Sequence, residues 1–409
     1  MIAPVQAVIL CGGLGTRLKP YTNSLPKPMM DCNGKPFLWH LLNQLHEQGI
    51  NQFILLTGYL SNKIEDYFND GSDWGWTIDY SIGPIEWDTG KRIWEARRKL
   101  KNRFLLLYSD NFATLRLNEI ISKHEINQKA ITFMVASKHP GNISFDEIGI
   151  VEKYDNHRSE KEMNYVEIGY MIVEKDKTLS FFDTPECSFS SILQKMSAQK
   201  EISGWLQNDQ YHSISDPKRW KKTQSYLTPK KIILIDRDGV INQKAPQGEY
   251  INSWDDFKWI TDTRTAMTAL SKIGFQFIVI TNQAGISRGS LNKNTLELIH
   301  SKMIEELEKD GIEIIDIYVC PHHWDEGCYC RKPNPGMLFQ ASNKHLLRLD
   351  KTVFIGDDLR DCQTAFKAGC HSIFIGKEEK LKKLSKDEYP IFNSQLLSEC
   401  VSNIIEHFN

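Results

Sequence analysis

Four groups of polar residues in the second half of the chain follow apolar, strand-like runs or, in one case, a loop. They are Asp236-Arg237-Asp238, Thr281-Asn282-Gln283, Arg331-Lys332-Pro333 and Gly356-Asp357-Asp358-Leu359-Arg360-Asp361. Open α/β sheets place ligands at the carboxyl ends of parallel strands, so we expect these groups to meet at one edge of a sheet. Asp236 and Asp238, two residues apart at a strand end, could be Mg²⁺ ligands or a nucleophile with its acid.

A glycine-rich segment follows the first strand-like run, which ends at Leu10. The segment reads Cys11-Gly12-Gly13-Leu14-Gly15-Thr16-Arg17-Leu18, and Leu25-Pro26-Lys27-Pro28 comes soon after it. Glycines let the backbone approach a polyphosphate, and consecutive N–H groups form an anion-binding nest. Arg17 and Lys27 add positive charge that could hold a triphosphate and a pyrophosphate leaving group. The spacing matches neither a dinucleotide-binding loop nor a Walker A loop, which argues against a dinucleotide enzyme or an ATPase.

Three of the nine cysteines lie within eleven residues. Cys320 and His322 are followed, after five residues, by Cys328 and Cys330, and these four side chains could bind Zn²⁺ tetrahedrally, with His323 as an alternative to His322. Four protein ligands leave no open position, so we expect a structural site that folds its loop. The odd, uneven set of cysteines favours a metal site in a reducing cytoplasm over a disulfide framework.

Short apolar runs alternate with helix-like segments along the chain, which predicts an α/β fold with parallel sheets covered by helices. We expect strands near Ala7–Leu10, Gln52–Thr57, Thr77–Ser81, Arg103–Tyr108, Ala130–Ala136, Ile232–Ile235, Phe277–Ile280, Ile314–Val319, Thr352–Ile355 and Ser372–Ile375. Helices are predicted at Pro36–Gln48, Ser61–Phe68, Gly90–Leu100 and Leu117–His124. A polar stretch before Ile232 suggests two domains, residues 1–228 and 229–409.

The composition is that of a globular protein. The 409 residues contain 41% hydrophobic and 25% charged residues, and the net charge is −2. This charge balance gives no support to binding of nucleic acid or of an anionic membrane. No apolar run reaches the roughly 18 residues of a membrane-spanning helix, and the first residues do not look like a signal peptide. We therefore expect a cytoplasmic protein.

The phosphate loop with its downstream Pro26-Lys27-Pro28 resembles the sugar-1-phosphate nucleotidyltransferases, over about residues 5–225. The resemblance implies that Asp110 binds the catalytic Mg²⁺ and that Glu167 accepts hydrogen bonds from sugar hydroxyls. Lys161, in Glu160-Lys161, would meet the sugar phosphate, with Lys153 as a rival. One departure is that Ser213 occupies the place where the family often has a second metal-binding carboxylate, although Asp209 and Asp216 are near in sequence.

The four polar groups of the second half resemble those of the haloacid dehalogenase-type phosphatases, over about residues 231–376. The resemblance implies that Asp236 forms an aspartyl-phosphate, Asp238 acts as acid and then base, Thr281 binds the phosphoryl group and Lys332 neutralises its charge. Mg²⁺ would lie between Asp236, the Asp238 carbonyl and Asp357. Asp358 and Asp361 would be structural or support the ligands.

The zinc loop, which runs into Arg331-Lys332, is similar to the heptose bisphosphate phosphatases and also to the histidinol-phosphate phosphatases. Arg288, Asn282 and Arg331 are candidates for substrate binding.

The two resemblances together predict two Rossmann-like domains and a bifunctional enzyme of nucleotide-activated heptose synthesis. The second domain would remove the 7-phosphate of D-glycero-D-manno-heptose 1,7-bisphosphate, and the first would join heptose 1-phosphate to a nucleotide, GTP being the expected donor. The partners would be small molecules, with Mg²⁺ and Zn²⁺ as cofactors. Alternatives are a hexose (mannose) 1-phosphate guanylyltransferase fused to another phosphatase, and a histidinol-phosphatase-like enzyme with an inactive transferase half. The oligomeric state, the sugar anomer and channelling stay open.

Overall fold

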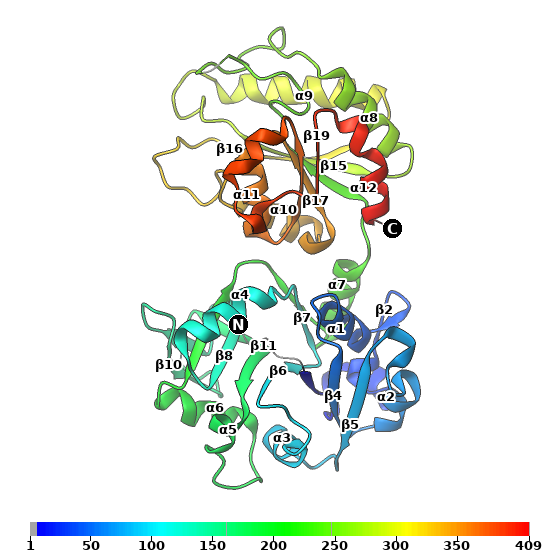
Figure 1. Ribbon diagram of the computed structural model, residues 1–409, viewed down its shortest axis with the longest axis vertical. Coiled ribbons are helices and arrows are strands. Elements are labelled where there is room, and N and C mark those ends of the chain that lie inside the picture. The colour runs from blue at the N-terminus through cyan, green and yellow to red at the C-terminus, as the bar shows by residue number, and fades with distance from the viewer. Residues whose placement is uncertain (1–5, 161, 247, 409) are drawn as a thin grey trace. The chain divides into compact units, whose positions relative to one another are not determined.

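The strand β1 (Gln6–Leu10) lies in the sheet of the first of two units into which the chain divides, Met1–Thr228 and Pro229–Asn409. The computed structural model describes residues 6–160, 162–246 and 248–408 (Figure 1). The main sheet of the first unit has the strand order β10-β9-β11-β6-β1-β4-β5, and β8 pairs with both β11 and β12. Their bounds are β4 Gln52–Thr57, β5 Thr77–Ile82, β6 Arg103–Tyr108, β8 Ile131–Ser137, β9 Ile143–Phe145, β10 Val151–Tyr154, β11 Tyr165–Glu174 and β12 Ile202–Gln207.

The prediction of a parallel sheet is correct for only part of the first unit. β1 pairs in parallel with β4 and β6, and β4 pairs in parallel with β5. β11 instead runs antiparallel to both β6 and β8. The chain reaches β11 from β8 through the antiparallel pair β9 and β10 rather than through a crossover helix, and such a connection reverses the strand direction.

The helices of the first unit pack around its strands, and two of them share a core cluster with the main sheet. They are α1 Phe37–His46, α2 Ser61–Phe68, α3 Thr89–Ala96, α4 Leu117–Asn127, α5 Lys175–Leu179, α6 Phe189–Ala198 and α7 Pro217–Leu227. In one core cluster Ile93 of α3 and Leu193 of α6 pack with Val8 of β1 and Leu106 of β6. Two short strands, β7 (Asn111–Ala113) and β13 (Tyr211–Ser213), pair antiparallel beside this sheet.

The second unit contains a parallel sheet with the order β16-β15-β14-β17-β18-β19. The strands are β14 Ile232–Ile235, β15 Gln276–Asn282, β16 Ile314–Cys320, β17 Val353–Gly356, β18 His371–Ile375 and β19 Phe392–Ser394, and the helices are α8 Thr261–Ser271, α9 Lys293–Lys309, α10 Gly336–His345, α11 Leu359–Ala368 and α12 Val401–Phe408. Successive residues of β14 belong to different hydrophobic core clusters. Ile233 packs with α8, α9 and α12, whereas Leu234 packs with α10 and α11. Both faces of the sheet are therefore buried, which explains the continuous apolar runs in the sequence.

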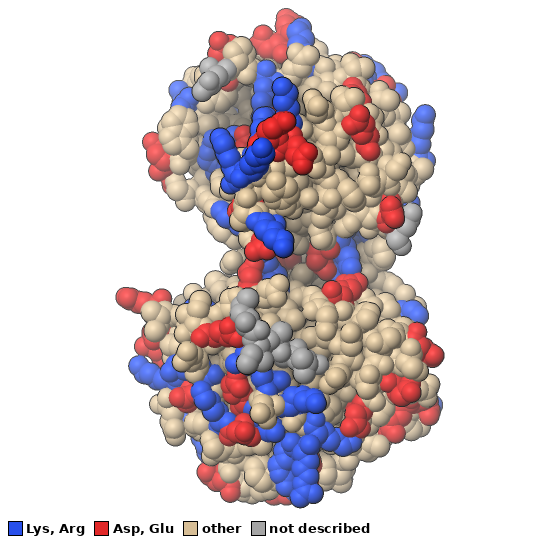
Figure 2. Space-filling view, in the orientation of Figure 1, with Lys and Arg blue, Asp and Glu red and all other residues tan. Residues whose placement is uncertain are grey.

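Both units are thus α/β, and the strand-like runs of the sequence analysis are strands in the structure. Among the described residues, no helix is both long and apolar enough to span a membrane. On the face drawn in Figure 2, basic and acidic side chains are interspersed over each unit, as expected for a net charge of −2.

Candidate active sites

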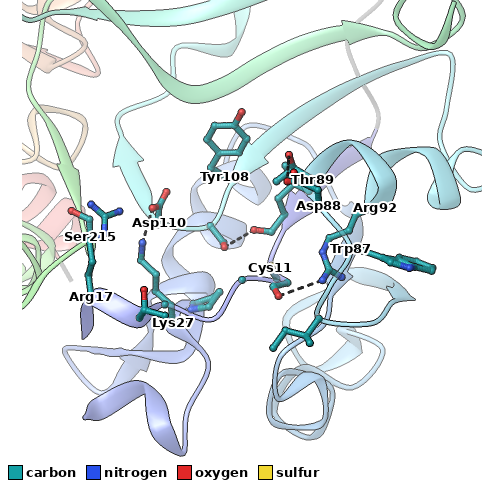
Figure 3. Close-up of a pocket in the computed structure, with 18 residues that line it drawn as sticks. Cys11, Arg17, Lys27, Trp87, Asp88, Thr89, Arg92, Tyr108, Asp110 and Ser215 are labelled. Carbon is teal, nitrogen blue, oxygen red and sulfur yellow. Dashed lines mark hydrogen bonds and ion pairs between the residues drawn. The ribbon is translucent and has the colours of Figure 1, made fainter. Parts of the chain in front are cut away.

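A cavity of about 450 Å³ lies beyond the carboxyl ends of β1 and β6 (Figure 3). Its lining includes the three glycines of the glycine-rich segment, called the phosphate loop below, and the basic residues of this region, together with the acid after β6: Leu10, Gly12, Gly13, Gly15, Thr16, Arg17, Lys27 and Asp110. The lining also includes Ile85, Trp87, Asp88, Thr89 and Arg92, which come from the segment after β5 and from α3. These five residues carry no phosphate-loop motif, and the sequence analysis did not single them out.

The phosphate loop packs too closely for side chains at two of its glycines. Gly15 has φ of +62°, and a Cβ there would lie 2.9 Å from Lys27 Cβ. A Cβ on Gly12 would lie 2.3 Å from Cζ of Arg92. The buried Arg92 guanidinium donates to the carbonyl oxygens of Thr57 at 2.6 Å and Pro84 at 2.7 Å. Arg92 therefore links the end of β4 to the segment after β5 and packs against the phosphate loop at Gly12. This role depends on contacts between residues that are far apart in sequence.

Lys27 and Asp110 form the main ion pair of this pocket. Lys27 Nζ donates to Asp110 Oδ2 at 2.6 Å, and the two side chains point toward each other in Figure 3. Asp110 follows β6, whose end is tied to β1 because Ser109 Oγ donates to the Leu10 carbonyl at 2.6 Å. A carboxylate beside a basic group at a phosphate loop can hold a cation and phosphate oxygens together.

Glu167 lies on β11, outside the pocket lining as the described residues define it. Its carboxylate accepts a hydrogen bond from the Gly169 N–H at 2.9 Å. Burial raises the pKa of Glu167 to about 8; the Gly169 hydrogen bond opposes this shift and the charge of Asp110 adds to it. Lys161 is outside the described residues. Its rival, Lys153, is ion-paired with Glu160 at the surface.

The segment around Ser213 supplies a hydroxyl to the pocket rather than a carboxylate. Within the described part of the chain, Ser215 lines the pocket, whereas Ser213 is buried with its Oγ 3.0 Å from Ser215 Oγ. Asp216 caps α7 by accepting the Arg219 N–H at 2.9 Å. Asp209 is buried and accepts the Gln210 N–H at 2.8 Å. Neither carboxylate belongs to the pocket lining.

In the second unit, the buried Lys332 lies between two carboxylates. Its Nζ is 2.9 Å from Asp236 Oδ1 and 2.7 Å from Asp361 Oδ1. Asp236, Asp357 and Asp361 can each place an oxygen within 4.8 Å of the others. Burial raises the pKa of Asp236, and the positive charge of Lys332 opposes that shift. Asp361 thus lies beside Asp236 and Lys332, in the group of residues that the sequence analysis expected to meet here, where it gave Asp361 a structural or supporting role.

Asp238 is held by three side chains. Arg237 donates to both of its oxygens at 2.9 Å, Asn242 Nδ2 donates to Oδ1 at 3.0 Å, and Gln283 Nε2 donates to Oδ2 at 2.7 Å. Although burial raises the pKa of Asp238, the Arg237 charge and these hydrogen bonds hold it below its usual range. The fully buried Arg237 is held in turn by His300 of α9, whose Nε2 is 2.9 Å from Nη1.

The other residues predicted for this site are in contact with its members. Gln283 Nε2 donates to Thr281 Oγ1 at 2.9 Å, and Asn282 exchanges hydrogen bonds with the backbone of Lys332 at 3.1 and 3.2 Å. Lys244 Nζ is 2.7 Å from Asp357 Oδ2, a contact that the sequence analysis missed. Among the described residues, no group hydrogen-bonds the buried Asp357 Oδ1. An orphaned carboxylate oxygen beside two further carboxylates fits the oxygen ligands that Mg²⁺ takes.

The four predicted zinc ligands converge at the end of β16. The Sγ atoms of Cys320, Cys328 and Cys330 are 3.4 to 3.6 Å apart, and His322 Nδ1 is 3.1 Å from Cys330 Sγ. Tetrahedral Zn²⁺ with Zn–S bonds of about 2.3 Å separates its sulfurs by about 3.8 Å, so this donor set fits Zn²⁺. The alternative His323 is directed to Asp325 instead.

Both arginines that were predicted to bind substrate contact the loop between β16 and α10, which carries the candidate zinc ligands. Arg331 Nη1 donates to the His322 carbonyl at 3.2 Å. Arg288 lies over the ring of the exposed Trp324, 4.1 Å from its centroid. The loop therefore orients both cationic side chains.

Comparisons with known proteins match the two units to different families. The family described as nucleotidyl transferase matches residues 6–210, half of the chain, and the family described as polynucleotide kinase 3 phosphatase matches residues 231–374. D-glycero-beta-D-manno-heptose-1,7-bisphosphate 7-phosphatase of Pseudomonas putida is 37% identical over 152 residues, 37% of this chain and 86% of that protein.

Two further matches concern one unit each. The histidine biosynthesis bifunctional protein HisB of Campylobacter jejuni is 33% identical over 147 residues, 36% of this chain and 42% of that protein. Among solved structures, HddC from Yersinia pseudotuberculosis aligns with 55% of this chain and 99% of its own, at 23% identity and a TM-score of 0.47.

Proposed function

The chain belongs to the nucleotidyl transferase family over its first half and to the D-glycero-D-manno-heptose-1,7-bisphosphate 7-phosphatase family over its second, and we propose that it is a bifunctional enzyme of nucleotide-activated heptose synthesis. The second unit removes the 7-phosphate from D-glycero-D-manno-heptose 1,7-bisphosphate. The first unit then transfers GMP from GTP to heptose 1-phosphate and releases pyrophosphate. The observation that carries this proposal is that one chain holds two sites suited to binding phosphate groups. They are the pocket with Lys27 and Asp110 and the cluster with Asp236 and Lys332.

In the phosphatase step, Asp236 is the nucleophile. A carboxylate oxygen of Asp236 attacks the phosphorus at position 7, and the sugar oxygen leaves with a proton from Asp238, which has to bind that proton against the Arg237 charge that lowers its pKa. Water then attacks the aspartyl-phosphate and gives a proton back to Asp238, which releases phosphate and restores Asp236. Lys332, whose Nζ is 2.9 Å from Asp236 Oδ1, stabilises the charge on the phosphoryl oxygens, and Thr281 donates a hydrogen bond to one of them.

In the transferase step, the protein positions two substrates and neutralises charge. An oxygen of the sugar 1-phosphate attacks the α-phosphorus of the nucleoside triphosphate in line, and pyrophosphate leaves. Arg17 and Lys27 hold the triphosphate against the backbone of the glycine loop. Glu167 orients the sugar through its hydroxyls, and Arg288, Asn282 and Arg331 have the corresponding role for the bisphosphate in the second unit.

Two cofactors follow from the donor sets. Asp236, Asp357 and the Asp238 carbonyl would hold Mg²⁺ in the phosphatase, with Asp361 adjacent, and Asp110 would hold Mg²⁺ in the transferase. Bound Mg²⁺ supplies charge neutralisation of phosphate oxygens. Cys320, His322, Cys328 and Cys330 would hold a structural Zn²⁺.

A direct test is to incubate the protein with heptose 1,7-bisphosphate, Mg²⁺ and GTP or ATP, and to identify the nucleotide sugar by mass. We expect GDP-heptose, phosphate and pyrophosphate. Because one matching relative is a histidine biosynthesis protein, histidinol phosphate is included as a phosphatase substrate, and mannose 1-phosphate as a transferase substrate. Faster turnover of histidinol phosphate or mannose 1-phosphate than of the heptose substrates would overturn the assignment.

A further inference from the structure

The pocket of the first unit has two chemically different ends (Figure 3). Arg17, Lys27 and Asp110 gather at one end, where Lys27 contacts Asp110 at 2.6 Å. Trp87 and Asp88, which precede α3, lie at the other end together with Arg92 of α3. Arg92 lies near Asp88 but donates its guanidinium N–H groups to the backbone carbonyls of Thr57 and Pro84. Basic groups bind phosphate oxygens, and this leaves Arg17 and Lys27 as the basic groups of the pocket for that role. If the pocket binds a nucleoside triphosphate, as proposed above, the phosphates lie toward Arg17 and Lys27 and the base lies toward Trp87 and Asp88.

Asp88 presents a fixed hydrogen-bond acceptor at the base end. Its Oδ1 accepts the Thr89 N–H at 2.7 Å, so the first turn of α3 orients the carboxylate. The hydrogen bonds that the structure records for Asp88 within the described residues involve Oδ1, which leaves Oδ2 available to a ligand. Ile85, 39% exposed, and Trp87 add apolar surface on which a flat ring can lie.

We propose that Asp88 selects guanine as the base of the nucleotide donor. Guanine presents two adjacent donors, N1–H and the 2-amino group, to a carboxylate. Adenine offers one amino group beside the acceptor N1, cytosine one amino group beside the acceptor N3, and uracil one N–H between two carbonyl oxygens. Each of these three bases would place an acceptor against the Asp88 oxygens, and unpaired or repelling polar contacts are the strongest source of discrimination in a binding site.

The variant Asp88→Asn tests this inference, because asparagine also caps helices and keeps an acceptor while replacing one oxygen with a donor. The assay measures kcat/KM for GTP, ATP and xanthosine triphosphate with heptose 1-phosphate as the second substrate. We expect the GTP-to-ATP ratio to fall by about tenfold or more, since a hydrogen bond to a charged group is lost. Xanthine carries an oxygen in place of the 2-amino group, so the variant should gain activity with xanthosine triphosphate relative to the wild type.

The matched control is Glu86→Gln, which also removes one negative charge. Glu86 lies two residues before Asp88, its side chain is exposed, and it is outside the described pocket lining. It should leave the GTP-to-ATP ratio unchanged. A wild-type enzyme that uses ATP as well as GTP, or an unchanged ratio in Asp88→Asn, overturns the base assignment and leaves nucleotidyl transfer established. If no triphosphate is used at all, the proposed function fails, and calorimetric titration of GTP, ATP and xanthosine triphosphate into both variants decides the base assignment separately.

Discussion

Each site pairs a carboxylate with a lysine at the end of a strand. Lys27 lies 2.6 Å from Asp110, and Lys332 lies 2.9 Å from Asp236. The pairs differ in burial, because Asp110 retains 30% of its side-chain exposure whereas Asp236 retains 9%. The more exposed carboxylate is accessible to a hydrated cation with a triphosphate, and the more buried one suits direct attack on phosphorus in a dry site.

Asp110 should be the main acidic residue of nucleotidyl transfer. We expect Asp110→Ala to lower kcat by about 100-fold or more, because it removes the only carboxylate at the cationic end of the pocket lining that the structure describes. Asp209→Ala and Asp216→Ala should lower it by less than about fivefold, since neither side chain lines the pocket and Asp216 contributes only a helix cap of about 1 kcal/mol. The measurement is pyrophosphate release with heptose 1-phosphate. Comparable loss in a folded Asp209→Ala or Asp216→Ala protein would indicate a second metal-binding carboxylate.

Glu167 should make the first unit less stable as the pH rises. Burial raises its folded-state pKa from 4.5 to about 8, so the folded protein favours the neutral carboxyl. The associated stability is fully present below the unfolded pKa and is lost as pH rises through the folded pKa. Glu167→Gln cannot ionise and keeps an acceptor for the Gly169 N–H, so its melting temperature should fall less than that of the wild type between about pH 5 and 9.

The control for this comparison is Glu152→Gln, on the exposed side of β10. It should show the wild-type pH profile, measured by circular dichroism without added metal. Parallel profiles for the wild type and Glu167→Gln would mean that Glu167 ionises in the folded protein as freely as in the unfolded chain.

At the scale of elements, we expect the loop between β16 and α10 to depend on its four candidate metal ligands, Cys320, His322, Cys328 and Cys330. It exposes Trp324 and Tyr329 at 60% and 54%, so apolar burial does little to fix its conformation. The loop nevertheless positions Arg331, and the next residue is the buried Lys332. Order in the loop is therefore expected to come from bound metal, which links a structural site to catalysis.

We expect one tightly bound Zn²⁺ per chain, and Cys328→Ser should lose it. Phosphatase activity should fall with the metal because Lys332 follows the loop directly, while nucleotidyl transfer should stay unchanged. Metal content by mass spectrometry and both activities provide the test, and Cys187→Ser, a cysteine outside the cluster, is the control. Absence of zinc from wild-type protein purified without chelator would refute the site.

At the scale of the whole molecule, the two activities should be separable. Asp236, the proposed nucleophile, belongs to the unit Pro229–Asn409, and Asp110 belongs to Met1–Thr228. Each unit has hydrophobic core clusters of its own, so a substitution within one site should not disturb the other.

Asp236→Asn should lower the rate of phosphate release from heptose 1,7-bisphosphate by about 1000-fold or more, because an amide cannot act as the nucleophile. Nucleotidyl transfer to supplied heptose 1-phosphate should stay near the wild-type rate. Asp110→Ala should give the reciprocal result in the same two assays. Equal loss of both activities in either folded variant would mean that the two reactions share a site.

Local spacing in the sequence was sufficient to identify the residues of short motifs. The glycines and Arg17 before Leu18, the pair Asp236 and Asp238, and the four predicted Cys and His ligands are each close together in the chain. Their geometry is set by a turn, a strand end or a single loop. The structure places the glycines and Arg17 in one pocket lining and the Cys and His side chains in one cluster. The strands that carry them were also predictable, because apolar runs bounded by glycine or polar residues leave few alternatives.

Only the tertiary structure decided which distant residues complete the sites. Arg92, Asp88 and Lys244 have no distinctive local signal, and each acquires its role from a contact made by chain folding. The direction of β11 relative to its neighbours was also decided only by the tertiary structure, since the sequence of one strand does not show whether its neighbours are parallel or antiparallel. Local spacing determines what a segment can do, whereas long-range packing determines which segments meet, because hydrogen bonds and ion pairs between distant residues form only once the cores are assembled.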